Sequence, residues 1–520
     1  MGPVKRGAAA RARAYAAGSR IPSPSAWGTD RIEAMKRLTL AGLLAVPTAA
    51  QNWNPTNPDV TGAISFGGAF ALGPGGRAVG FANFGTGGTR PAFWDGAGSH
   101  ELPILAGDDE GLAVEINASG TSVGISVDYV NQGTLTYIYE HPVVWIGGQA
   151  IDLRTQVTGG DPLELLSCSG IDAQGRVIGR ARKLPAGSTG LRGFLFDNGI
   201  VTDLGDLNPS GFAGTDANAF GAHGEIVGAS TAPTSFTHAM LWKAGAMTDL
   251  HDFAQMPGRN SHAYAINANG VIVGSGDFGA DFLDFETGAM WKNGVITDLG
   301  SLAPGQIWAQ AFAFGINLQE QVVGATNLPN GEARAFLWQS GVMSDLSTKL
   351  APGSGWILTS AEDIDDEGRI VGQGLFQGSL MPFLLLPNCD GTYTALPGGC
   401  MGSGALTPQL AGVGCPGAGW NAALRVTNGA SGSFGVLLFG TGSGALPITP
   451  SCALGIAPLL GNPVIPFALQ GSGAGGGEHA FVFSIAAGSS AFDVWTQAAV
   501  IDAGAPDLVA ATNPLLVHVQ

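Results

Sequence analysis

The chain has 520 residues, of which 45% are hydrophobic, 12% are charged and 83 are Gly. Residues 1–50 hold eight of the 23 basic and two of the 40 acidic residues, so the remaining 15 basic and 38 acidic residues leave a net charge of −23. A surface this acidic repels phosphate backbones and anionic membranes, so we expect no nucleic-acid partner.

The N-terminal region contains the pattern of a secretory signal peptide. In MKRLTLAGLLAVPTAA (Met35–Ala50), two basic residues precede a mostly apolar run, Leu38–Val46, and small residues stand before Gln51. A run of this length is too short to span a bilayer, and the alternative is a buried helix. Residues 1–34 are rich in Ala and Arg and are interpreted as an upstream extension outside the fold. No later stretch is long enough for a membrane span, so we expect a secreted protein.

Most of the chain repeats one ten-residue pattern. It is clearest in AINANGVIVGS (Ala265–Ser275), where a strand leads into Ile-Asn, a tight turn follows, and a second strand ends in Val-Gly. The seven copies recur about every 49 residues. Their final glycines are Gly80, Gly124, Gly179, Gly228, Gly274, Gly324 and Gly372.

A second motif lies between successive copies, as in AMWKNGVITDL (Ala289–Leu299). An apolar strand ends in Trp, a two-residue turn follows, and a short strand ends in Asp-Leu. Asn or Asp followed by Gly tolerates the positive φ angles of hairpin turns. Four short strands in each unit, repeated seven times, are typical of a β-propeller. We therefore predict an all-β protein with a seven-bladed β-propeller over residues 51–388, and an open β-solenoid is the alternative.

The two linked motifs resemble the bacterial extracellular repeat family that is named for its His-Ala-Phe (HAF) signature. His238-Ala239-Met240 and Arg334-Ala335-Phe336 stand where that signature would lie, and the resemblance covers Ala63–Pro387. It implies secretion and a propeller-like fold, but no catalytic residues. Units 1 and 4 lack the Ile-Asn core, which leaves the geometry of their turns open.

A different composition begins after the repeats. Residues 389–404 are rich in Cys and Gly and are predicted to be a linker, and residues 405–520 contain strand-length apolar stretches that predict a small β-sandwich. The passage from Trp495 to Val519 resembles the terminal module of secreted proteins from planctomycete-type bacteria, which implies an accessory role.

Four of the five cysteines lie in this C-terminal part, as expected for disulfides in a secreted protein. Three pairings are open, and local pairing predicts Cys389–Cys400 with Cys415–Cys452. Cys168 stands alone in a repeat and is predicted to be a small buried residue.

One acidic run resembles half of a calcium-binding loop. In DIDDEG, Asp363, Asp365 and Glu367 alternate before a Gly, which suits a hard cation, but Gly374 stands where a loop of this kind needs Glu. These three residues are a weak candidate for calcium, and a solvated repeat turn is the alternative. We expect no other metal or cofactor.

Other candidate residues recur with the repeat, which indicates structure more than chemistry. Ser122 in GTSVG matches a nucleophile elbow but lies in repeat register. The repeated Asp residues are predicted to accept backbone N–H groups at turns: Asp152, Asp203, Asp249, Asp298 and Asp345. The repeated Trp residues are predicted to pack between blades: Trp94, Trp145, Trp242, Trp291 and Trp338.

These observations predict a secreted, non-catalytic binding or structural protein, whose partner is a polysaccharide or a surface protein. The alternative is a secreted hydrolase or lyase with its site in the central mouth of the propeller. Sites on propellers usually come from loops that break the repeat, which here are Ser126–Pro142, Ala181–Arg192 and Asp277–Glu286.

Overall fold

A computed structural model describes residues 53–56 and 67–520, except for short gaps at 86–87, 96–97, 133–134, 185–189, 209–213, 280–284, 307, 388, 390, 418–420, 462, 472 and 487–488. The predicted signal peptide (residues 35–50) and the predicted extension (residues 1–34) lie outside the described residues. Contacts divide the chain into two units, the second of which contains Pro387–Gln520 and the short segments Asn317–Gln321 and Asp366–Gly368.

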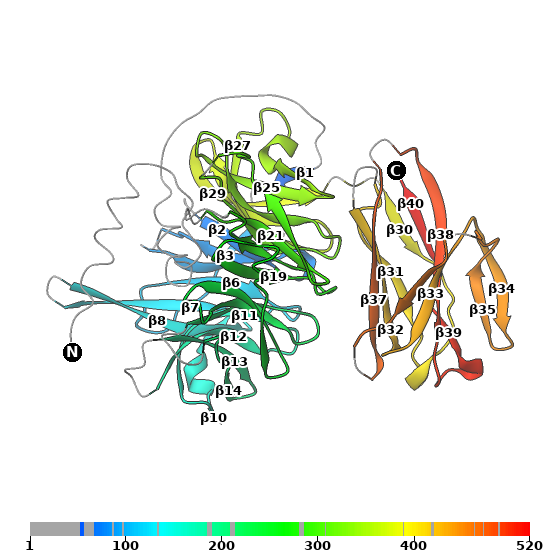
Figure 1. Ribbon diagram of the computed structural model, residues 1–520, viewed down its shortest axis with the longest axis horizontal. Coiled ribbons are helices and arrows are strands. Elements are labelled where there is room, and N and C mark those ends of the chain that lie inside the picture. Colours follow the sequence, from blue (N-terminus) through cyan, green and yellow to red (C-terminus); the bar gives the residue numbers. More distant parts are fainter. Residues whose placement is uncertain are drawn as a thin grey trace. The chain divides into compact units, whose positions relative to one another are not determined.

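The first unit consists of four-stranded antiparallel sheets that follow one another along the chain (Figure 1). The first three sheets are β2 (Gly67–Leu72), β3 (Ala78–Ala82), β4 (Arg90–Asp95) and β5 (Gly98–Glu101); β6 (Glu110–Ile116), β7 (Ser122–Gln132), β8 (Leu135–Ile146) and β9 (Gln149–Asp152); and β11 (Leu163–Ile171), β12 (Val177–Lys183), β13 (Leu191–Asp197) and β14 (Ile200–Asp203), with β10 (Gly159–Gly160) parallel to β14.

The next three sheets have the same strand order. They are β15 (Thr215–Phe220), β16 (Ile226–Thr231), β17 (Thr237–Lys243) and β18 (Ala246–Asp249); β19 (Ser261–Ile266), β20 (Ile272–Gly276), β21 (Thr287–Lys292) and β22 (Val295–Gly300); and β23 (Ala311–Ile316), β24 (Val322–Asn327), β25 (Ala333–Gln339) and β26 (Val342–Asp345). The helices in the described residues are short 3₁₀ turns, η3 (Pro74–Gly76), η4 (Leu153–Gln156), η5 (Leu346–Lys349), η6 (Ser403–Ala405) and η7 (Pro506–Leu508).

The last sheet of this unit closes a ring with the first. It combines β27 (Trp356–Ile364), β28 (Ile370–Phe376) and β29 (Ser379–Pro387) with the N-terminal strand β1 (Trp53–Thr56). Ala69 and Trp94 of the first sheet share a buried cluster with Val371 of β28, and Leu72 N donates to Asp363 Oδ2 at 2.8 Å. Antiparallel sheets that pack in a closed ring confirm the predicted all-β propeller fold.

The repeated glycine is required by a bulge in the inner strand of each sheet. In the fifth sheet, the register between β19 and β20 shifts between Ala263 and Ala265. This shift presses the His262 carbonyl against Gly274, where a Cβ atom would lie 1.8 Å from the oxygen. At all seven repeat glycines the corresponding distance is 1.8–2.1 Å, so no side chain fits at this position.

The Asn or Asp of the repeat holds the tight turn that follows the inner strand. Asn267 Oδ1 accepts the N–H groups of Asn269 and Val271, both at 3.0 Å. Unit 4 has Gly221 at this position, yet Gly221 N donates to Glu225 O at 2.8 Å, as Asn267 N does to Val271 O at 3.0 Å. The backbone bond of unit 4 therefore forms without the side chain. Unit 1 makes the same bond from Gly73 to Arg77, but its turn differs, because it is the 3₁₀ segment η3 with Gly75 at φ +70°.

The second unit is a β-sandwich, as predicted. One sheet has the order β30 (Thr392–Ala395), β40 (Leu515–Val519), β38 (Phe492–Ile501), β33 (Phe434–Gly440), β36 (Ile465–Ala468), with β39 (Val509–Ala511) also paired to β38. The other has the order β31 (Gln409–Gly414), β32 (Asn421–Ala430), β37 (Ala474–Ser484), and β34 (Ser443–Thr449) and β35 (Cys452–Ile456) form a hairpin. Leu424 of the small sheet and Leu437 and Val517 of the large sheet share one buried core.

Residues 389–404 belong to this sandwich and do not form a free linker. Within them, β30 pairs with the C-terminal strand β40, and Cys400 N donates to Ala511 O at 2.8 Å. The disulfides are Cys389–Cys415 and Cys400–Cys452, so the predicted local pairing is wrong. Strand pairing causes the difference, because it brings Cys400 into the buried cluster that contains Cys452 of β35.

Candidate functional site

The insertions of the propeller lie on one face. In each antiparallel sheet, the connection from the second to the third strand leaves at the same end as the connection from the fourth strand to the next sheet. All three predicted insertions are connections of the first kind. Binding sites are often formed by such insertions on a rigid scaffold, so this insertion-bearing face is where a site is expected.

The insertion Ser126–Pro142 is not an irregular loop. It is a two-stranded ribbon in which β7 and β8 continue their pairing from Ser122↔Trp145 to Gln132↔Leu135. The other two insertions, Ala181–Arg192 and Asp277–Glu286, contain residues 185–189 and 280–284, which lie outside the described part of the chain.

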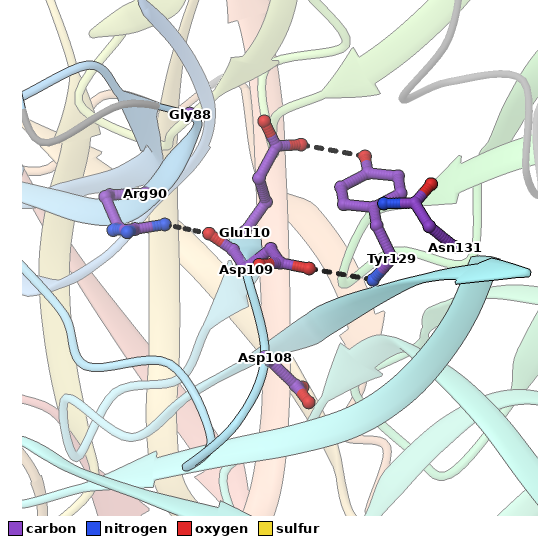
Figure 2. Close-up of a pocket in the computed structure, with 7 residues that line it drawn as sticks. All are labelled: Gly88, Arg90, Asp108, Asp109, Glu110, Tyr129 and Asn131. Carbon is purple, nitrogen blue, oxygen red and sulfur yellow. Dashed lines mark hydrogen bonds between the residues drawn. The ribbon is translucent and has the colours of Figure 1, made fainter. Parts of the chain in front are cut away.

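A pocket of about 460 Å³ opens on this face between the first two sheets. Figure 2 shows its lining residues, which come from the start of β4, from the connection into β6 and from the ribbon. They are Gly88, Arg90, Asp108, Asp109, Glu110, Tyr129 and Asn131. All but Gly88 carry a hydrogen-bonding side chain, so the pocket is polar with a predominance of carboxylates.

Hydrogen bonds hold the pocket's acidic side chains in place. Tyr129 donates twice, from its hydroxyl to Glu110 Oε2 and from its backbone N–H to Asp109 Oδ2, both at 2.8 Å (Figure 2). Arg90 donates to the Asp109 carbonyl. His141 Nδ1 lies 2.9 Å from Asp108 Oδ2. Tyr129 of β7 thus holds two of the three carboxylates and His141 of β8 holds the third, which pre-organises the lining.

One further carboxyl group, that of Glu140, has a pKa well above its usual value. Burial raises the pKa of Glu140, on β8, to about 7, although the nearby Arg180 guanidinium lowers it. Arg180 itself donates from Nε to Asp216 Oδ1 at 2.9 Å. These three residues come from three consecutive sheets. A carboxyl group with a pKa near 7 can exchange a proton at neutral pH.

The end of the third insertion carries a buried polar cluster. Glu286 Oε2 accepts hydrogen bonds from Ser275 Oγ at 2.5 Å and lies 3.1 Å from His262 Nδ1. Burial opposes ionisation of Glu286, but the charge and hydrogen bond of His262 and the bond from Ser275 hold its pKa below the usual value. Because the carboxylate stands between Ser275 and His262, the imidazole cannot take the hydroxyl proton directly, as a nucleophilic relay requires.

A pair of buried imidazoles lies in the fourth sheet and the connection that follows it. The rings of His238 and His251 stack with centroids 4.3 Å apart. His238 Nδ1 lies 2.8 Å from Asp249 Oδ2, and His251 Nδ1 lies 2.9 Å from Ser261 Oγ. Both Nε2 atoms are buried and have no hydrogen-bond partner in the described structure.

The weak calcium candidate is not assembled into a cation site. Both carboxylate oxygens of Asp365 accept from Arg369, Oδ1 from its backbone N–H at 2.8 Å and Oδ2 from Nε at 2.5 Å. Asp363 Oδ2 accepts from Leu72 N, and Glu367 is exposed. Among the described residues, no group of three or more His, Cys, Asp or Glu side chains could hold a metal ion.

The structural roles predicted for the repeated Asp residues are confirmed. In every case Oδ1 accepts the N–H of the residue two positions later, at 2.8–3.0 Å. The acceptors are Asp152, Asp203, Asp249, Asp298 and Asp345.

The roles predicted for the repeated Trp residues are also confirmed, since each packs against the preceding sheet of the ring. Ser122 is buried in strand register at the start of β7, and Cys168 is a buried free thiol whose pKa is raised by burial. Neither residue lies in a catalytic arrangement.

Sequence reasoning missed the pocket. Its signal was the run Asp108-Asp109-Glu110, three consecutive acids in a chain with only 12% charged residues. The contribution of Tyr129 carried no signal, because it depends on how the ribbon folds over the connection into β6.

Fold and site together define an all-β protein, a propeller followed by a sandwich, with an acidic pocket on the insertion-bearing face. The family model described as "Protein of unknown function (DUF3466)" matches residues 109–382. This match covers more than half of the chain, so the protein belongs to that family. No curated protein sequence matches the chain significantly.

Several solved structures are similar at low sequence identity. A Trypanosoma rangeli sialidase in complex with the inhibitor DANA is 10% identical, with a TM-score of 0.29, over 90% of this chain and 92% of the sialidase. PorZ, a bacterial surface component of the type-IX secretion system of Porphyromonas gingivalis, is 10% identical, with a TM-score of 0.28, over 85% of this chain and 64% of PorZ. The Bombyx mori GH32 β-fructofuranosidase BmSUC1 is 9% identical, with a TM-score of 0.24, over 90% of both chains. Scores this low support no transfer of activity.

Two findings bear on location. The two disulfides of the sandwich indicate folding in an oxidising compartment, which points to an extracellular or cell-surface protein. Among the described residues, no helix combines the length and the apolar character that crossing a lipid bilayer requires.

Proposed function

We propose that this protein is a secreted, non-catalytic binding protein whose propeller takes an uncharged glycan in the pocket lined by Asp108, Asp109, Glu110 and Tyr129. The observation that carries the proposal is the pre-organised lining of this pocket. Hydrogen bonds already hold its side chains, so little side-chain conformational entropy is lost when a ligand binds.

The charge of the pocket selects the ligand class. Three carboxylates and one guanidinium line it, so an anionic ligand would be repelled. Sugar hydroxyls can donate to carboxylates and accept from Arg90 and Asn131. A neutral polyol therefore matches both kinds of group, and pockets with a few placed polar groups are typical ligand sites.

Secretion is the second part of the proposal. It is supported by the signal-peptide pattern of Met35–Ala50, by the two disulfides and by the resemblance of the repeats to the HAF-type extracellular family. A surface protein is the other partner class in this proposal. We propose no cofactor for either role.

A specific observation favours one alternative. A hydrolase or lyase needs a group that exchanges a proton near neutral pH, and Glu140, whose pKa burial raises to about 7, is such a group. In this alternative, which replaces the predicted site in the central mouth of the propeller, Glu140 is the general acid. Turnover of a glycan by the wild type but not by E140Q would establish it.

The proposal is tested by glycan binding with the chain from Gln51 onward. Uncharged oligosaccharides, namely cellohexaose, xylohexaose and chitohexaose, are titrated against the wild type and Y129F by calorimetry. Y129F removes the hydroxyl that holds Glu110 and keeps the ring. We expect Y129F to bind at least tenfold more weakly, whereas equal binding by both proteins would remove the pocket from the proposal.

A further inference from the structure

The outer edge of β8 is free along the β7–β8 ribbon. Its pairing with β9 reaches only to Val143↔Asp152, and no other described strand pairs with β8 on that side. Residues 135–139 therefore pair with β7 alone, and Figure 1 shows this ribbon extending past the rest of its sheet. The β7 edge differs, because the Tyr129 N–H already donates to Asp109 Oδ2 at 2.8 Å. The β8 side is thus the edge of the ribbon that can accept another strand.

The turn between β8 and β9 shows which backbone groups of the free edge point outward. Its two glycines have φ angles of +58° and +79°, as in a type I′ turn, so Ile146 and Gln149 form a hydrogen-bonded pair. The direction of the backbone groups alternates along a strand, so the even-numbered residues of β8 point theirs to the β9 side. Beyond the end of β9, the N–H and C=O groups of Thr136, Ile138 and Glu140 therefore point outward from the sheet.

This edge lacks the features that usually prevent a free strand from pairing. Charged side chains, Pro residues and bulges serve that purpose in natural sheets. Residues 135–139 contain no charge and no Pro, and their register with β7 has no shift. Three consecutive apolar or aromatic side chains here are exposed, Tyr137 at 42%, Ile138 at 54% and Tyr139 at 46%. An exposed run of this kind marks a surface that binds another protein.

We propose that a second copy of this chain occupies the edge, in an antiparallel pairing of the two β8 strands centred on Ile138. The outward N–H and C=O groups of the two Ile138 residues bond to each other, and those of Thr136 bond to Glu140 of the second copy on either side. Two ribbons thus join into one four-stranded sheet about a twofold axis, the commonest symmetry of homodimers. The inference stands apart from the proposed function, since it uses the edge of the ribbon and not the pocket.

The side chains of the edge complement themselves in this register. On one face of the joined sheet, Tyr137 lies opposite Tyr139 of the second copy, and on the other face the two Ile138 side chains meet. Each exposed apolar side chain therefore gains an apolar cross-strand neighbour. A pairing centred on Tyr137 would place Ile138 opposite Thr136, and one centred on Tyr139 would place it opposite Glu140. This self-complementarity favours a second copy over an unrelated strand.

The test places charges at the centre of the pairing, in the chain from Gln51 onward. In I138K and in I138E, like charges face each other across the twofold axis, whereas mixing the two proteins brings opposite charges together. The control is V295K, because Val295 of β22 is as exposed, at 57%, but lies in the fifth sheet. Association is measured by sedimentation velocity over a concentration series. Since both positions are exposed, thermal unfolding should be unchanged, which is checked for each variant.

We expect the wild type and V295K to dimerise with dissociation constants within twofold of each other, and I138K and I138E to dimerise at least tenfold more weakly. An equimolar mixture of I138K and I138E should regain dimers. A wild type that stays monomeric over the whole series, or an I138K dimer as tight as that of the wild type, would overturn the inference. A mixture that stays monomeric would overturn the pairing centred on Ile138. None of these results depends on glycan binding, so the proposed function is tested separately.

Discussion

His238 Nδ1 lies 2.8 Å from Asp249 Oδ2, and Oδ1 of the same carboxylate accepts the backbone N–H of His251 at 2.9 Å. His238 is the first residue of the HAF-like motif, and Asp249 is the acid of the Asp-Leu motif. One carboxylate therefore fixes both the turn and the neighbouring strand. This double use explains why the two motifs recur together in the repeat.

Other sheets make the same connection with different donors. Thr287 Oγ1 donates to Asp298 Oδ1 at 2.7 Å. Arg334 Nε lies 3.6 Å from Asp345 Oδ2, as an ion pair. Different donors thus reach the carboxylate in different sheets, and in the fourth sheet His238 serves as a structural hydrogen-bond donor.

The first prediction concerns pH. Burial and the neighbouring His238 lower the pKa of His251, although Asp249 and Asp252 nearby raise it. The folded state then binds fewer protons than the unfolded state, whose His pKa is about 6.5, so stability is complete above that pH and is lost as pH falls below it. Protonation of Glu140, whose pKa burial raises to about 7, adds stability over the same range and does so in both proteins. We therefore expect the propeller's Tm in the wild type to fall relative to that of H251Q between pH 7 and pH 5, as followed by circular dichroism.

A matched variant isolates this effect. Burial also lowers the pKa of His479, which lies in the sandwich. H479Q should leave the pH dependence of the propeller transition unchanged. If H251Q lost as much Tm as the wild type, the imidazole pair would not be the titrating element.

The second prediction concerns the repeat glycine. In G274A the added Cβ would lie 1.8 Å from the His262 carbonyl oxygen, so the bulge must open. We expect a loss of at least about 3 kcal/mol in the free energy of unfolding, measured by urea titration. The control is G270A, where a Cβ meets nothing within 4 Å but φ is +75°. That variant should lose only about 1 to 2 kcal/mol, from left-handed backbone strain. Equal losses in the two variants would refute the steric argument.

The third prediction concerns the disulfide Cys400–Cys452, which spans 52 residues. Removing it in C400S/C452S increases the conformational entropy of the unfolded chain. This should lower the free energy of unfolding of the sandwich by about 3 to 4 kcal/mol. C168S is the control, because this thiol forms no disulfide and lies in the propeller, so the sandwich transition should not move in C168S. Differential scanning calorimetry should show only the sandwich transition moving in C400S/C452S. A shift of the propeller transition instead would contradict this assignment.

The fourth prediction concerns calcium. A cation at the DIDDEG turn would have to displace Arg369 from both carboxylate oxygens of Asp365. We therefore expect the same Tm in millimolar calcium and in EDTA. A rise in the Tm of the wild type with calcium, absent in D365N, would restore the acidic turn as a metal site.

The fold was predictable to the extent that it follows from local periodicity. Turn residues such as Asn293-Gly294, the repeat glycines and the Asp-Leu motif each act within one sheet, so their spacing predicted the strands and the ring. The ribbon was not predictable in this way. Its sequence lacks the repeat, and only the pairing of β7 with β8 shows that it is ordered strand.

The candidate site was largely hidden in the sequence. Asp108, Asp109 and Glu110 form a visible acidic run, but Tyr129, which bonds to two of them, lies about 20 residues further along. Its contribution depends on a hairpin folding back over the connection into β6. The disulfides show the same limit, since Cys400 meets Cys452 only because distant strands pair.

The sequence by itself determined the repeating architecture, because turns, bulges and strand alternation are set by residues close together in the chain. Only the tertiary structure decided which acids line a pocket, which cysteines bond and which tyrosines remain exposed. Those relationships join residues separated by tens of positions, and the free energy that selects them comes from packing whole sheets together.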